Sequence, residues 1–182
     1  MSGRRARLGV LVSGQGTNLQ AILDATQDPD YPAEVVVVVS DRPQAYALER
    51  ARRAGVPAYV VPWGKDPAEA GCRVARVLEA HEVEWVCLAG FLRILDPQFV
   101  QRYRGRILNI HPSLLPAFGG RGMYGERVHR AVLASGATES GCTVHFVTAE
   151  VDAGPVVAQA RVPVLPRDTV ETLAARVAEQ EH

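Results

Sequence analysis

The sequence lacks a net charge and has little cysteine, and both features narrow the classes of protein it can belong to. Twenty Lys and Arg residues balance 20 Asp and Glu residues over 182 residues. The chain therefore has no net positive charge that would attract it to a nucleic-acid backbone or an anionic membrane. Its three cysteines, at positions 72, 87 and 142, are widely spaced and form no Cys-x-x-Cys pair. A disulfide framework and a cysteine zinc site do not fit, and we expect a reducing, cytoplasmic compartment.

Long apolar segments are missing as well. The five consecutive valines of Val35–Val39 fall far short of the roughly 20 residues that a membrane-spanning helix needs. The basic N-terminus runs straight into a strand-like segment, which argues against a signal peptide. The composition, 47% hydrophobic and 22% charged, is typical of a folded domain. We expect one domain over residues 1–182 that binds neither membrane nor nucleic acid.

The pattern of short β-branched segments alternating with helical segments predicts an α/β fold. It is typical of a doubly wound, mostly parallel, Rossmann-like sheet with right-handed crossovers. The last two expected strands are joined by a link too short for a parallel crossover, so we expect them to be antiparallel. The expected strands cover residues 8–12, 34–40, 58–61, 84–89, 106–110, 141–148 and 156–164. The expected helices begin near residue 18 and cover 45–54, 67–81, 97–103, 126–134 and 168–181.

The segment Ser13–Asn18 joins the first strand to the first helix, at the carboxyl edge where such sheets hold their ligands. Backbone N–H groups and the helix dipole can bind a phosphate there. The segment has neither the lysine of a P-loop nor the third glycine of a dinucleotide site. A single phosphomonoester therefore fits better than a nucleoside triphosphate or NAD. A simple tight turn between strand and helix is the alternative.

Asn109 and His111 end the fifth expected strand, two residues apart, and so point the same way. An amide donor beside an imidazole suits acyl transfer, because the amide stabilises an oxyanion while the histidine moves a proton. Asp152 lies in an Asp-Ala-Gly turn. It either serves only the turn or orients His111 and stabilises its imidazolium form. His145 is either a further supporting residue or a half-buried strand residue.

Two other chemistries are less favoured. Ser113 follows His111 too closely for a catalytic triad, and the chain has no Gly-x-Ser-x-Gly elbow. The histidines at 111, 129 and 145 and Asp152 show no ligand spacing that is typical of a metal site. We therefore predict no metal.

Four segments, which follow one another in the same order as in the family, resemble the phosphoribosylglycinamide formyltransferase family of folate-dependent transformylases. They are Val12–Gln20, Leu88–Leu95, the Asn-Ile-His-Pro-Ser-Leu-Leu-Pro block of Asn109–Pro116, and Gly141–Val147. The Asn-x-His block is shared by formyltransferases that use 10-formyltetrahydrofolate, whereas the Gly-x-Gly-Thr-Asn loop is specific to this branch. The resemblance implies transfer of a formyl group from 10-formyltetrahydrofolate to the glycinamide amine, with small molecules as the only partners.

The resemblance also implies a role for particular residues. Asn109, His111 and Asp152 match the catalytic trio, and Glu181 matches a residue that contacts the nucleotide. Gly16, Thr17 and Asn18 match the substrate-phosphate loop. The folate pocket is matched by two segments, Leu92, Arg93, Ile94 and Leu95 in the first half and Thr148, Ala149, Glu150 and Val151 in the second.

Three departures from the family pattern stand out. The chain is shorter at its C-terminus, the Gly119–Gly125 loop is longer than in some members, and Ala68 stands where some members use an arginine for folate. Two alternative functions within the same superfamily are those of the initiator methionyl-tRNA formyltransferase and of formyltetrahydrofolate hydrolase. Both are less favoured, because these enzymes normally carry additional domains. A non-catalytic nucleotide-binding module is disfavoured, because a simple binder has no need of Asn109, His111 and Asp152 together.

Overall fold

The computed structural model describes residues 4–182, which divide into two compact units. The N-terminal unit ends at Leu108 and the C-terminal unit begins at Asn109, so the boundary falls within strand β5 (Ile107–His111). Each unit has its own helices and its own hydrophobic cluster.

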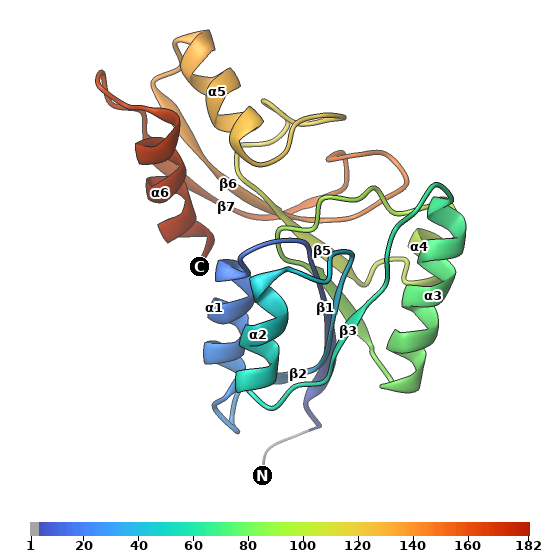
Figure 1. Cartoon of the computed structure of the whole chain (residues 1–182). Coiled ribbons are helices and arrows are strands. Elements are labelled where there is room, and N and C mark those ends of the chain that lie inside the picture. The colour runs from blue at the N-terminus through green and yellow to red at the C-terminus, as the bar shows by residue number, and fades with distance from the viewer. Residues whose placement is uncertain (1–3) are drawn as a thin grey trace. The chain divides into compact units, whose positions relative to one another are not determined.

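The N-terminal unit is a parallel sheet with helices on both faces. Strand β1 pairs in parallel with β2 and with β4, and β2 pairs in parallel with β3. Figure 1 shows α1 and α2 on one face of this sheet and α3 and α4 on the other. The strands are β1 (Ala6–Val12), β2 (Ala33–Ser40), β3 (Ala58–Val60) and β4 (Trp85–Leu88). The helices are α1 (Thr17–Thr26), α2 (Tyr46–Arg53), α3 (Pro67–Ala80) and α4 (Pro97–Arg102).

Local sequence explains where these elements form. The valines at the end of β2 are buried, as expected for a strand covered on both faces. Helices α3 and α4 each begin with a proline that follows an aspartate cap. Asp66 accepts hydrogen bonds from the amides of Ala68 and Glu69, and Asp96 accepts one from Gln98. Aspartate at the N-cap and proline at the first helical position both favour a helix start.

The C-terminal unit contains two longer antiparallel strands, β6 (Glu139–Phe146) and β7 (Val156–Pro163). Helices α5 (Glu126–Ser135) and α6 (Val170–Glu181) pack with them around a small apolar cluster. Thr169 caps α6 in a reciprocal capping box with Thr172. The cluster contains Val132, Cys142, Val162, Leu173 and Val177.

The predicted fold class is confirmed. The seven strands form a mixed sheet in the order β3-β2-β1-β4-β5-β6-β7, with parallel pairs in its first half and an antiparallel pair at its end. The predicted span of β6 was wrong by two residues at each end. Pairing with β7 begins at Glu139, and the strand stops at Phe146, before a turn in which the Thr148 hydroxyl donates to the carbonyl of Glu150. Within residues 4–182, no helix has the length and apolar character to cross a membrane.

Candidate active site

The loop after β1 presents an uncapped helix start. Gly16 is the N-cap of α1 and has a φ of 78°, a conformation that favours glycine. No side chain of the described residues caps this helix, and its first turn contains no acidic residue. The amides of Thr17 and Asn18 therefore have no acceptor within the helix and lie at the positive end of its dipole. The three residues predicted to bind phosphate thus lie together at an uncapped helix start, a kind of position that can bind an anion.

The first predicted folate segment is joined to the ends of β1 and β2. The amide of Leu92 donates to Oγ of Ser13 (3.0 Å), directly after β1. Nε of Arg93 donates to Oδ2 of Asp41 (2.7 Å), directly after β2. The Asp41 side chain is fully buried, whereas that of Arg93 is 40% exposed. Ile94 is exposed. The segment that follows β4 is therefore held at the same edge of the sheet as the phosphate loop.

Four of the predicted site residues meet in the C-terminal unit. Nδ1 of His111 lies 3.6 Å from Oδ2 of Asp152. Nδ2 of Asn109 lies 3.1 Å from Nε2 of His145, and that nitrogen is 3.9 Å from Oδ1 of Asp152. The side chains of His111, His145 and Asp152 are only 4%, 2% and 11% exposed. The cluster is therefore largely withdrawn from water, where charge interactions are stronger than in solvent.

His145 determines how the Asn109 amide is turned. Its Nδ1 lies 3.1 Å from the carbonyl oxygen of Phe146, which only accepts hydrogen bonds, so Nδ1 carries a proton. Burial lowers the pKa of His145, so the ring is neutral at pH 7 and Nε2 is an acceptor. The partner atom on Asn109 must then be the donor Nδ2. The second N–H of that amide remains to donate to another group.

His111 lies between two acceptors. Its Nε2 is 2.9 Å from the carbonyl oxygen of Phe118, and its Nδ1 faces Asp152. An imidazolium, with a proton on each nitrogen, satisfies both acceptors at once. Asp152 also accepts a hydrogen bond from the amide of Gly120 (2.9 Å). Phe118 and Asp152 both have positive φ values, 56° and 55°, which is uncommon for residues other than glycine. Strained backbone of this kind is often found at functional sites.

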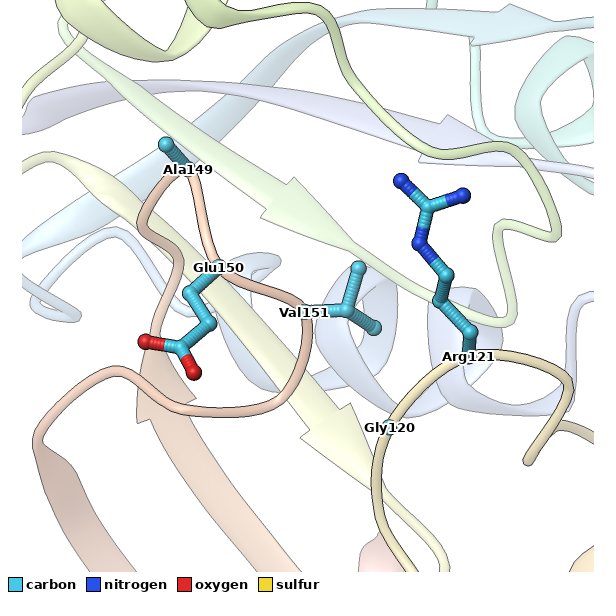
Figure 2. Close-up of a pocket in the computed structure, with 5 residues that line it drawn as sticks. All are labelled: Gly120, Arg121, Ala149, Glu150 and Val151. Atoms are coloured by element: carbon cyan, nitrogen blue, oxygen red, sulfur yellow. The ribbon is translucent and has the colours of Figure 1, made fainter.

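A cavity of about 560 Å³ is lined by Val151, which precedes Asp152 in the sequence, and by Gly120, whose amide donates to Asp152. Figure 2 shows its two walls, one loop with Gly120 and Arg121 and another with Ala149, Glu150 and Val151, and the Val151 side chain points toward the first loop. Such a volume is typical of a small-molecule site. Three of the residues predicted to bind folate therefore line a cavity next to Asp152. The long glycine-rich loop forms its other wall, which was not expected from the sequence.

The remaining predicted residues are placed as follows. Glu181 lies on the last turn of α6, and its charge adds to burial in raising the pKa of Cys142 on β6. Ser113 is buried and its hydroxyl donates to the carbonyl of Ala117 (2.6 Å), so in this structure it bonds the local turn rather than a histidine. Within the described part of the chain, no group of three or more His, Cys, Asp or Glu side chains is arranged so that it could hold a metal ion.

Some groups of the candidate site could not be predicted from the sequence. The Phe118 carbonyl and the Gly120 amide act through the backbone, which every residue has. The only sequence sign of them was the glycine-rich loop in which they lie. His129 on α5 is buried, and desolvation lowers its pKa, with nearby His111 contributing. A histidine within a helical apolar stripe gives no indication of such a neighbour.

Comparison with known proteins identifies similar chains over nearly the whole length. The family model for formyl transferases matches residues 6–182. The phosphoribosylglycinamide formyltransferase of Haemophilus influenzae is 44% identical over 178 residues, which is 97% of this chain and 82% of that protein. The crystal structure of glycinamide ribonucleotide transformylase 1 from Symbiobacterium toebii has a TM-score of 0.88 and 49% identity, and the match covers 99% of this chain and 84% of that one.

A further relative is much larger than this chain. The trifunctional purine biosynthetic protein adenosine-3 of Gallus gallus is 48% identical over 184 residues, which include 98% of this chain. The chain spans only 17% of the length of that protein.

Proposed function

The chain belongs to the formyl transferase family, and on that basis we propose that it transfers the formyl group of 10-formyltetrahydrofolate to the amine of N1-(5-phospho-D-ribosyl)glycinamide. This reaction is a step of de novo purine biosynthesis. The observation that carries the proposal is the cluster of Asn109, His111, His145 and Asp152, in which an amide donor and imidazoles lie close to a carboxylate. Those groups suit acyl transfer to an amine.

In the proposed reaction the folate supplies an activated formyl group, and the residues of the chain stabilise charge and move protons. The amine nitrogen attacks the formyl carbon, and the carbonyl electron pair moves to oxygen. The free N–H of Asn109 and a ring N–H of His111 donate to that oxyanion. In the structure, the Phe118 carbonyl is the acceptor for Nε2 of His111. The formyl oxygen therefore has to take the place of this carbonyl when the folate binds. Collapse of the intermediate breaks the bond to the folate nitrogen.

Proton movement completes the proposed mechanism. The attacking amine loses a proton and the folate nitrogen gains one. Asp152 faces His111 across 3.6 Å, which suits a carboxylate that stabilises the imidazolium while the oxyanion exists. Donors and proton carriers are sufficient for this chemistry, and the proposal assigns no role to a metal ion.

The binding of both substrates is also proposed. The phosphate lies on the amides of Gly16, Thr17 and Asn18, and Glu181 contacts the nucleotide. The folate lies along Leu92, Arg93, Ile94 and Leu95 and along Thr148, Ala149, Glu150 and Val151. The cavity lined by the last three of these residues supports this assignment. The enzyme is proposed to act in the cytoplasm on small molecules alone. Cys72, Cys87 and Cys142 are all free thiols, which fits a reducing compartment.

One assay separates this reaction from its relatives. The purified chain is mixed with 10-formyltetrahydrofolate, and the absorbance change on deformylation is followed with and without glycinamide ribonucleotide. We expect turnover that requires the nucleotide and yields its formylated product. Turnover without the nucleotide would instead indicate a hydrolase. The matched controls are His111→Ala, which should lose activity, and Cys72→Ser, an exposed change that should not.

A further inference from the structure

Helix α2 packs behind the phosphate loop and binds two successive carbonyl groups of it. The amide of Ala47 donates to the carbonyl of Gly14 (3.0 Å). Nε of Arg50 donates to the carbonyl of Gln15 (2.7 Å). A Cβ atom on Gly16 would lie 2.6 Å from Cβ of Ala47, so helix and loop are in close contact. The carbonyl face of the loop is therefore turned toward α2.

This arrangement fixes the direction of the loop amides. In a planar trans peptide the N–H points opposite to the C=O of the same unit. Since the carbonyls of Gly14 and Gln15 point toward α2, the amides of Gln15 and Gly16 point away from it. Among residues 4–182 neither amide has a backbone acceptor, so both extend the set of unbonded N–H groups at the start of α1. A concave run of successive N–H groups is typical of an anion site.

Arg50 is held in place on several sides. Its Nη1 donates to Oε1 of Gln20 (3.3 Å), and its guanidinium lies 4.9 Å from the centroid of the Tyr46 ring. Its side chain forms no ion pair with any residue in 4–182. A cation without a carboxylate partner thus lies beside a helix start that has no acidic residue in its first turn. Positive charge gathered in this way favours a bound anion.

We propose that Arg50 is a positioning residue for the phosphate loop. By holding the Gln15 carbonyl from behind, it aims the amides of Gln15 and Gly16 at the phosphate, and it does not itself need to touch the substrate. The inference rests on the proposed function, because that function places the substrate phosphate at this loop. It adds the two loop amides and a residue of α2 to the site.

Kinetics of four proteins test this role: the unchanged chain, Arg50→Ala, Arg50→Lys and the control Arg53→Ala. Arg53 lies on the same helix and near the same ring (5.9 Å), but its hydrogen bond goes to Glu49 and not to the loop. For Arg50→Ala we expect KM for the nucleotide to rise roughly 10- to 100-fold, the loss typical of hydrogen bonds to a charged group. The kcat and the KM for folate should stay within about threefold, and Arg50→Lys should recover part of the loss.

A substrate without its phosphate, glycinamide riboside, shows whether the effect acts through the anion. The unchanged chain and Arg50→Ala should use the riboside equally well, because neither can gain from the loop amides. An Arg50→Ala protein with an unchanged nucleotide KM would overturn the inference. An equal loss with nucleotide and riboside would do the same, since it would show general damage to the fold.

Phosphate binding keeps this test separate from the reaction itself. Inorganic phosphate is titrated into the labelled chain, and the amide NMR signals of the loop are followed. We expect Gln15 and Gly16 to shift together with Thr17 in the unchanged chain, and to shift only at much higher phosphate concentration in Arg50→Ala. This result would support the inference even if the formyl transfer assay failed. A loop whose Gln15 and Gly16 signals do not respond to phosphate would overturn it even if formyl transfer occurred.

Discussion

Replacing Asp152 by asparagine removes one charge from the candidate active site and little else. Asparagine tolerates the left-handed backbone of this position, where φ is 55°. Its side-chain oxygen can still accept the amide hydrogen bond of Gly120. The loop should therefore keep its shape. What is lost is the negative charge that faces Nδ1 of His111 across 3.6 Å.

The size of the effect follows from that separation. Two unit charges 3.6 Å apart in a medium of effective dielectric constant about 20 interact by about 4.6 kcal/mol. That corresponds to about three orders of magnitude in rate, within the roughly 10²- to 10⁴-fold range of a positioned acid–base group. The loss should appear in kcat more than in KM, because the imidazolium charge matters most in the transition state.

The assay is steady-state formyl transfer by Asp152→Asn, His111→Ala and the double variant. If Asp152 acts through His111, the double variant should lose much less than the product of the two single losses. Glu171→Gln, which neutralises an exposed carboxylate of the same unit, serves as the control. A kcat within threefold of the unchanged chain for Asp152→Asn would remove Asp152 from the mechanism. Losses that multiply fully would show that the two residues act independently.

Three further changes have definite expected outcomes. Gly16→Val should raise the nucleotide KM steeply with little change in folate KM, since a Cβ there would lie 2.6 Å from Cβ of Ala47 at a φ of 78°; equal losses for both substrates would count against the phosphate assignment. Asp168→Asn should lower the melting temperature at pH 7, because Arg176 holds the pKa of Asp168 below its ordinary value of 3.8. That difference should shrink as the pH falls below about 3.8 and toward the lowered pKa, and a difference that persisted unchanged at low pH would contradict the reasoning. Burial lowers the pKa of His129, so below about pH 6.5 the unfolded chain binds a proton at this residue that the folded chain does not bind. The free energy of unfolding therefore decreases as the pH is lowered. In His129→Gln this decrease should be smaller by up to about 1.4 kcal/mol per pH unit, as measured by denaturant unfolding.

Most of the fold could be predicted because its signals are local. The five valines of β2 and the Asp-Pro starts of α3 and α4 each specify one element through its own residues. The short link between β6 and β7 excluded a parallel crossover. The ends of β6 were missed because cross-strand pairing sets them, and the partner residues on β7 are distant in the sequence.

The candidate site also contains residues that local sequence predicts and contacts that only the folded chain creates. Asn109 and His111 could be placed together because they are two residues apart on one strand. The meeting of His145 with Asn109 depends on how the chain folds back, and it could only be an open alternative. The Phe118 carbonyl, the Gly120 amide and the Arg50 bond to Gln15 involve backbone atoms, so residue identity does not predict them. The resemblance to a family suggested candidate side chains, and the structure shows the backbone groups that contact His111 and Asp152.

The proposed function is that the cluster around His111 transfers a formyl group to the glycinamide amine. The most direct measurement uses 10-formyltetrahydrofolate labelled with ¹³C in the formyl carbon and follows the label by NMR in the presence of glycinamide ribonucleotide. We expect the label to move to the new N-formyl group on the amine of the nucleotide, with no build-up of free formate, and we expect His111→Ala to abolish the transfer. Label that appears as formate, or transfer that survives in His111→Ala at the full rate, would contradict it.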